Sequence, residues 1–184
     1  MLENQIYILL RSTIASQILA RQGAPLGLGI KVRRQPQQEG RPTAPTVYID
    51  KVADKRYGWR QSESRWDAAA GIMRLYEAQA METTLQITFQ QISSTDPTAL
   101  TASDVAQIVA ATCQSDKFIA TIGRSGVQVL RVTDVRNLPY KNDLDQWEFV
   151  PSFDLVIKHT NEYVDSVPVV TVFEFDIHAV PDII

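Results

Sequence analysis

Acid–base chemistry in this chain would depend on two histidines, His159 and His178, which both fall in segments of strand-like composition. A Ser–His–Asp arrangement could be assembled from Ser152, His159 and Asp154. The chain has no nucleophile-elbow sequence and no glycine-rich oxyanion turn to accompany such a triad. We therefore expect the two histidines to be solvated strand residues, and we predict that the protein is not an enzyme.

Metal and phosphate sites are also poorly supported. One cysteine and two distant histidines do not make a zinc-ligand spacing. Asp143 and Asp145 lack the glycine-centred loop with a terminal glutamate that calcium sites use. The glycines at 23–29 and 123–126 lack the Lys-Ser/Thr of a P-loop, so they predict turns. We predict no metal and no cofactor.

A basic segment raises the question of nucleic-acid binding. Four cations lie within eleven residues: Lys31, Arg33, Arg34 and Arg41. Such side chains can contact phosphates, but they can also be solvated or meet an acidic protein partner. A small nucleic-acid-binding module that uses loop 31–41 is therefore the alternative to the function inferred below.

A second cluster mixes cations with aromatic rings at residues 55–60, with the sequence KRYGWR. Aromatic residues and arginine are the types that anchor protein interfaces. If this segment is exposed, it predicts an interface; alternatively, Tyr57 and Trp59 pack on the core. The interface candidates are Arg56, Tyr57, Trp59, Arg60 and Trp66.

The length of the chain limits its organisation. With 184 residues, of which 45% are apolar, it can bury roughly two-thirds of its unfolded surface, which predicts one domain over residues 1–184. No apolar run approaches the roughly 20 residues of a membrane helix. The single cysteine, Cys113, excludes an internal disulfide and fits a reducing cytoplasm.

Charge is unevenly distributed along the chain. Residues 1–60 carry ten Lys and Arg against four Asp and Glu, or +6, and residues 61–184 carry eight against seventeen, or −9; the sum is the net charge of −3. This net charge gives no reason to expect general nucleic-acid affinity. The division could let a basic surface of one copy meet an acidic surface of another.

Two segments have helical periodicity. Between Asn4 and Gln22 the spacing predicts a helix whose stripe is Ile6, Leu9, Leu10, Thr13, Ile14, Gln17 and Ile18. A second helix is predicted from a cap at Thr101 or Ser103 to about Ser115, with Val105, Ile108, Val109 and Thr112 inside. Because Ala106 stands three residues after Ser103, we expect no reciprocal capping box.

The remaining segments predict strands. Alternation places Val47 and Ile49 on one face, with Tyr48 and Asp50 on the other. Residues 54–81 predict a strand, a hairpin tip and a returning strand, although a helix over 64–80 is the alternative. Further extended segments are predicted at 28–32, 83–92, 127–135, 147–159 and 168–180, with a polar turn at 137–146. Phe149, Phe153, Leu155 and Ile157 are the buried candidates of the segment at 147–159.

Helices that flank runs of strands predict an α+β fold with hairpin connections. We expect a mostly antiparallel sheet with a long β-hairpin extension at about residues 55–80. An N-terminal helix and a central helix should flank this sheet.

Six features together resemble the neck gateway and tail-terminator-like proteins of tailed phages. They are the amphipathic first helix, the proline-rich segment before TVYI at 46–49, KRYGW at 55–59, METTLQITFQ at 81–90, the short central helix and DQWEFVPSFDLVIKH at 145–159. The resemblance covers nearly the whole chain. It implies a tail-terminator-like fold.

The resemblance also implies a function. Such proteins form six-membered rings at the head–tail junction, join or terminate the tail tube and leave an axial channel through which DNA passes without sequence-specific binding. The implied partners are further copies of the chain and neighbouring adaptor, collar, tube or sheath proteins. No cofactor and no membrane are implied. The location would be the virion neck or tail, after assembly in the host cytoplasm.

Overall fold

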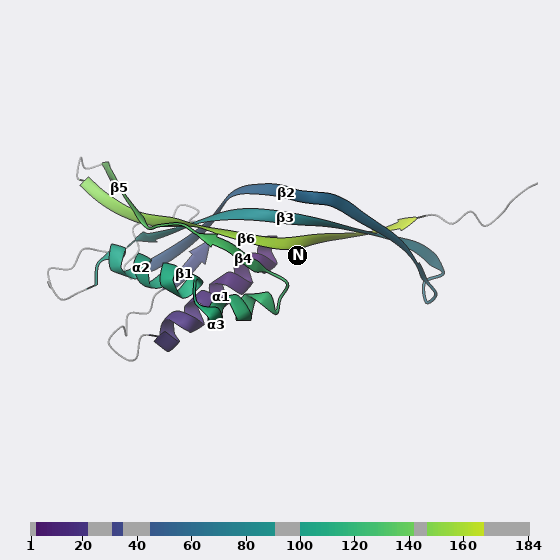
Figure 1. Ribbon diagram of the computed structural model, residues 1–184, viewed down its shortest axis with the longest axis horizontal. Helices are drawn as coiled ribbons and strands as arrows, with labels where there is room; N and C mark the ends of the chain where they lie inside the picture. Colours follow the sequence, from purple (N-terminus) through teal and green to yellow (C-terminus); the bar gives the residue numbers. More distant parts are fainter. Residues whose placement is uncertain (1–2, 22–30, 35–44, 91–99, 142–146, 168–184) are drawn as a thin grey trace, which may run out of the picture. The chain divides into compact units, whose positions relative to one another are not determined.

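The computed structural model describes residues 3–21, 31–34, 45–90, 100–141 and 147–167 (Figure 1). Along the chain these form α1 (Glu3–Arg21), β1 (Lys31–Arg34), β2 (Thr46–Asp67), β3 (Ile72–Gln90), α2 (Ala102–Cys113), α3 (Asp116–Gly123), β4 (Gln128–Val132), β5 (Arg136–Lys141) and β6 (Trp147–Val167). The predicted α+β class is confirmed.

The six described strands form one mostly antiparallel sheet with the order β1-β2-β3-β6-β4, and β5 also pairs with β6. β1 is parallel to β2, with Lys31 opposite Thr46. β4 and β5 are each antiparallel to β6. A short turn joins β2 to β3, which confirms the predicted hairpin and excludes the alternative helix at 64–80.

The chain divides into two compact units. The first lies within Met1–Trp59 and Gln79–Asn161, and the second lies within Arg60–Ala78 and Glu162–Ile184. β2, β3 and β6 contribute residues to both units. A single domain with an arm at about residues 55–80 stays a prediction.

The core of the first unit lies between the helices and one face of its part of the sheet. Figure 1 shows α1, α2 and α3 on the same side of this part. The predicted stripe of α1 is confirmed, since six of its seven members are buried and Leu9 packs partly buried against them. Alternation along the strands brings Leu85, Ile87 and Phe89 from β3 and Phe153, Leu155 and Ile157 from β6 into the same core.

The central helical region differs from the prediction in two ways. Thr101 is the N-cap of α2, and Asp104 completes a reciprocal capping box, so the expectation that no box forms was wrong. The prediction considered Ser103 as the first partner and overlooked that Asp can take the third position after Thr101. A third helix, α3, follows directly, with Ser115 as its N-cap. Only Phe118 and Ile122 of α3 are buried, which is too weak a pattern for prediction.

Two expectations near β6 were wrong. The predicted turn at 137–146 contains β5, whose Asn137 and Pro139 lie opposite Pro151 and Phe149. Pairing with β6 thus overrides the turn-like composition of this segment. Phe149 is 63% exposed rather than buried, because alternation predicts the face of a strand but not whether anything covers it. The predicted strand at 168–180 lies outside the described residues.

Two isoleucines of α1 test this core with one substitution. Ile14 is fully buried, so Ile14→Ala should lower the free energy of unfolding by about 2–5 kcal/mol. Ile8 is 68% exposed on the same helix, so Ile8→Ala should change it by less than about 0.5 kcal/mol. Urea unfolding followed by circular dichroism measures both. Equal effects would contradict the assigned core face.

Candidate assembly surfaces

The three residues of the hypothetical triad do not form one. His159 is only 5% exposed, and its Nε2 lies 2.9 Å from Oγ1 of Thr83. The Asp154 carboxylate instead accepts a hydrogen bond of 2.8 Å from Arg136. Ser152 is buried on β6, where alternation places it with Asp154 on the face opposite His159. The expectation that His159 is solvated was wrong, because β3 supplies a hydrogen-bonding partner inside the sheet. His178 lies outside the described residues.

His159 ends a chain of polar contacts that crosses the first unit. Nζ of Lys51 donates to Oε2 of Glu3 at 2.6 Å and to Oδ2 of Asp54 at 2.9 Å. The Thr83 hydroxyl donates to Oδ1 of Asp54 at 2.7 Å. Since the Thr83 proton is used there, Nε2–H of His159 is the donor to Oγ1 of Thr83. These polar contacts link α1, β2, β3 and β6 at the point where β2 leaves the core.

These contacts shift the pKa values of their members. Burial would raise the pKa of Asp54, but the hydrogen bonds from Thr83 and Lys51 lower it further than burial raises it. Hydrogen bonds to Glu3 and Asp54 raise the pKa of Lys51. Burial lowers the pKa of His159, which favours the neutral ring. The network therefore holds ionised Lys51 and Asp54 beside a neutral histidine.

Metal-ligating residues do not gather in the part of the chain that the structure describes, where no group of three or more His, Cys, Asp and Glu lies together. Asp143 and Asp145 lie outside that part. Cys113 is buried in the core, and burial raises the pKa of its thiol to about 12. None of the described helices has the length and apolar content of a membrane span.

The basic segment is only partly described, because Arg41 lies outside the described residues. Arg34 forms an ion pair with Glu3, and its guanidinium lies 4.5 Å from the centre of the Tyr7 ring. Lys31 is exposed and Arg33 is half-buried on β1. Arg34 thus serves to hold α1 against β1, which weakens the prediction of a phosphate-binding loop.

The aromatic residues of the first unit are exposed. Trp59 has 96% of its surface exposed and Tyr57 has 56%, so neither ring packs in the core. Gly58 between them has a φ of 72°, a left-handed conformation that favours glycine and is typical of a bulge in a strand. Nε2 of Gln79 donates to the backbone carbonyls of Tyr57 and Gly58, at 3.0 and 3.3 Å. Gln79 thereby supports the backbone that presents both rings.

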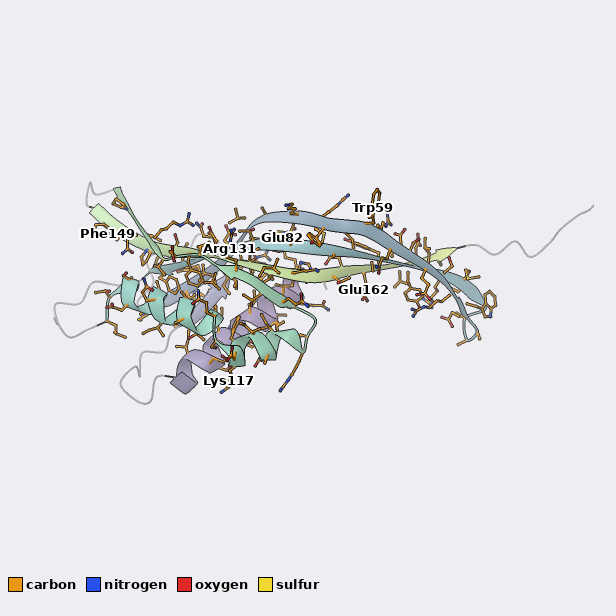
Figure 2. All side chains as sticks on the ribbon, viewed as in Figure 1. Trp59, Glu82, Lys117, Arg131, Phe149 and Glu162 are labelled. Carbon is orange, nitrogen blue, oxygen red and sulfur yellow. The ribbon has the colours of Figure 1, made fainter. Side chains whose placement is uncertain are left out.

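Both rings lie on the face of the sheet that the helices do not cover. Ile157 faces the core, so its neighbour Lys158 points to the other face. Nζ of Lys158 lies 5.0 Å from the centre of the Tyr57 ring, which places Tyr57 on that face as well. Figure 2 shows Trp59 projecting from β2 away from the helices. An aromatic anchor in this position is available to a partner.

In the second unit, one face of the hairpin carries a network of charges. Nε of Arg74 donates to Oδ2 of Asp67 at 2.7 Å, and the Arg65 guanidinium pairs with Glu63 and lies 5.1 Å from the centre of the Tyr76 ring. Oδ1 of Asp67 also accepts from the backbone of the turn, and these hydrogen bonds, that from Arg74 foremost, lower the pKa of its carboxyl group. The tip is thus an ordered turn.

The opposite face of this hairpin is more apolar. Arg60 pairs with Glu77 across the strands, so alternation places Trp66 of β2 with Met73 and Leu75 of β3 on their face. Trp66 is 55% exposed, and Met73 and Leu75 are half-buried. The five interface candidates are therefore all exposed: Arg56, Tyr57 and Trp59 in the first unit, and Arg60 and Trp66 in the second.

Two features of these surfaces were not predicted. Tyr163 and Val164 at the end of β6 are adjacent, so their side chains point to opposite faces of the strand. Both are more than half exposed, which means that neither face is covered there. The polar network around Thr83 was missed because its members are distant in sequence. The alternation of β6 through His159 was the one available signal that this histidine faces the core.

Comparison with known protein families identifies a match. The family described as "E217 gateway protein gp29" matches residues 5–169. No curated protein matches the chain.

Burial of His159 predicts a pH-dependent stability. An unfolded histidine titrates near pH 6.5, whereas the folded one has a lower pKa. Between these two values only the unfolded chain binds the proton, so the free energy of unfolding should fall as the pH is lowered below about 6.5. His159→Gln should remove this slope in urea unfolding measured between pH 5 and 8. His178 is present in both proteins, so equal slopes would contradict the assignment.

Proposed function

The chain belongs to the E217 gateway protein gp29 family of phage neck proteins, and on that premise we propose that it forms a ring in the virion neck. Membership makes it a structural protein that interacts with other neck or tail proteins. The proposed ring has six members, joins or terminates the tail tube and leaves an axial channel for DNA. The copies would assemble in the host cytoplasm.

The observation that carries this proposal is the exposure of β2. Residues 52–66 are all exposed, which means that both faces of this strand are open in the isolated chain. Antiparallel sheets normally bury at least one face, and a bare hairpin has little stability in water. A strand of this length with Trp59 and Trp66 exposed is best accounted for by contact with another molecule.

A ring supplies that contact from identical copies. It is closed by a heterologous interface, in which one patch meets a different patch on the next copy. Arg56, Tyr57 and Trp59 of the first unit form the proposed first patch. Arg60 and Trp66 are further interface candidates on the hairpin at about 55–80, which would reach onto the neighbour. The excess of cations in residues 1–60 and of anions in residues 61–184 would let a basic patch of one copy meet an acidic patch of the next.

A DNA channel also requires a suitable charge. A strongly cationic wall would hold passing DNA, so we propose that the lumen is neutral or acidic and that loop 31–41 is turned away from it or balanced. The ion pair between Arg34 and Glu3 supports a balanced loop.

The alternative function makes the opposite prediction for DNA. If loop 31–41 bound nucleic acid, several phosphate contacts would give an affinity that falls steeply with salt. We expect instead that fluorescence anisotropy with a labelled duplex shows no binding tighter than about 10 μM between 50 and 200 mM salt. Tight, salt-sensitive binding that Lys31→Glu abolishes would favour the alternative.

Trp59→Ala tests the ring interface. A buried aromatic anchor contributes about 2 kcal/mol or more, so the dissociation constant for assembly should rise about 30-fold. The urea midpoint of the isolated chain should stay unchanged, because Trp59 is exposed there. Phe149→Ala, an exposed aromatic outside the candidate patch, is the control.

Analytical ultracentrifugation and electron microscopy of the purified protein measure the assembly and the ring symmetry. A chain that stays monomeric at high concentration and also fails to assemble with tail tubes would overturn the ring proposal.

A further inference from the structure

The outer edge of β2 is unpaired over most of its length. β1 pairs with Thr46 to Ile49 and is the only described strand on that side. From Asp50 to Asp67 the backbone N–H and C=O groups of this edge therefore have no partner strand in the described part of the chain. An open edge of this kind is a template for a strand from another chain.

β6 has a second open edge. β5 pairs with Trp147 to Ser152, and β4 pairs with Leu155 to Lys158. Beyond Lys158 no described strand continues on that side, although β6 extends to Val167. Residues 162–166 are exposed as well, so this segment lacks cover on both faces.

The charged side chains without a described ion-pair partner have opposite signs on the two open edges. On β2, Lys55 and Arg56 are exposed and form no ion pair with any residue that the structure describes. On β6, Glu162 and Asp165 are exposed and likewise have no described cationic partner. Each charged pair adjoins exposed apolar side chains, which are Tyr57 and Trp59 on β2 and Tyr163 and Val164 on β6.

These charges select between the possible pairings. Two β2 edges brought together would place cations beside cations, and two β6 edges would place anions beside anions. Only the unlike combination joins opposite charges and also covers apolar side chains on both strands. This combination is heterologous, so each copy offers one edge of each kind to its two neighbours.

We propose that the β2 edge around Lys55–Trp59 of one copy pairs with residues 162–165 of β6 in a second copy, which continues the sheet from subunit to subunit. The inference rests on the proposed ring and names the strands that form its interface. Main-chain hydrogen bonds between the edges supply affinity, and the four charged side chains set the choice of partner and the register.

Two double charge reversals test the pairing. Lys55→Glu/Arg56→Glu makes both edges acidic, and Glu162→Lys/Asp165→Lys makes both edges basic. Each variant alone should assemble at least about tenfold more weakly than the unmodified chain at low salt, and the difference should shrink at high salt. An equimolar mixture of the two should regain assembly, because alternating copies again join unlike edges.

A matched control separates these charges from charge in general. Lys117→Glu reverses an exposed cation on α3, away from both edges, and should leave assembly unchanged. All four altered side chains are exposed, so the urea midpoints of the monomers should match that of the unmodified chain. Amide hydrogen exchange adds a direct readout, since peptides covering 50–59 and 159–167 should become protected on assembly.

The outcomes distinguish the edge pairing from the ring. If the unmodified chain forms rings but the two variants assemble equally well, or the mixture does not recover, the edge pairing is wrong and the ring stands. If the amides of both edges exchange as fast in the ring as in the monomer, the pairing is also wrong. If the unmodified chain forms no ring, both proposals fail.

Discussion

The structure depends on the burial of one sheet face by three helices. The stripe of α1 and the buried residues of α2 and α3 pack against alternate residues of β3 and β6. This packing supplies the hydrophobic stabilisation of the first unit, because the residues concerned are almost fully removed from water. Of the described residues of β2, Val47 and Ile49 near its start belong to this core, and the neighbouring strand β1 contributes Val32. Everything that β2 presents after Ile49 lacks this support.

The polar network lies where this support ends. Lys51 and Asp54 follow directly after the last core residue of β2, and they tie that strand to Glu3 of α1 and Thr83 of β3. Hydrogen bonds to charged groups are stronger than those between neutral groups. The network therefore fixes the course of β2 at the point where hydrophobic contacts stop. Beyond this network the strand is exposed, but its backbone is still held at Tyr57 and Gly58 by hydrogen bonds from Gln79.

Sequence periodicity predicted the elements that enter the core. The 3–4 spacing of α1 and the alternation of Leu85, Ile87 and Phe89 follow directly from burial on one face. Phe149 shows the limit of this reasoning, because it continues the alternation of β6 and yet nothing covers it. β5 shows another limit, since a segment with turn-like composition becomes a strand when a partner strand is available.

The residue types of the candidate surface could be recognised in the sequence, but their exposure could not be predicted from it. Arginine, tyrosine and tryptophan together indicate an interface, but the same rings would satisfy a core, and only the exposure of Trp59 separates the two. Residues paired across β2, β3 and β6 could not be found from sequence, because such contacts join positions up to a hundred residues apart.

The exposed part of β2 explains why its charges matter. A long strand with open faces and an open edge would aggregate with its own kind unless something opposes that pairing. β2 contains no proline, so like charges such as Lys55 and Arg56 are the feature of this strand that opposes such pairing. Charges that repel an identical edge necessarily attract an edge of opposite sign. In the proposed edge pairing, a single set of side chains would therefore both prevent uncontrolled association and select the partner.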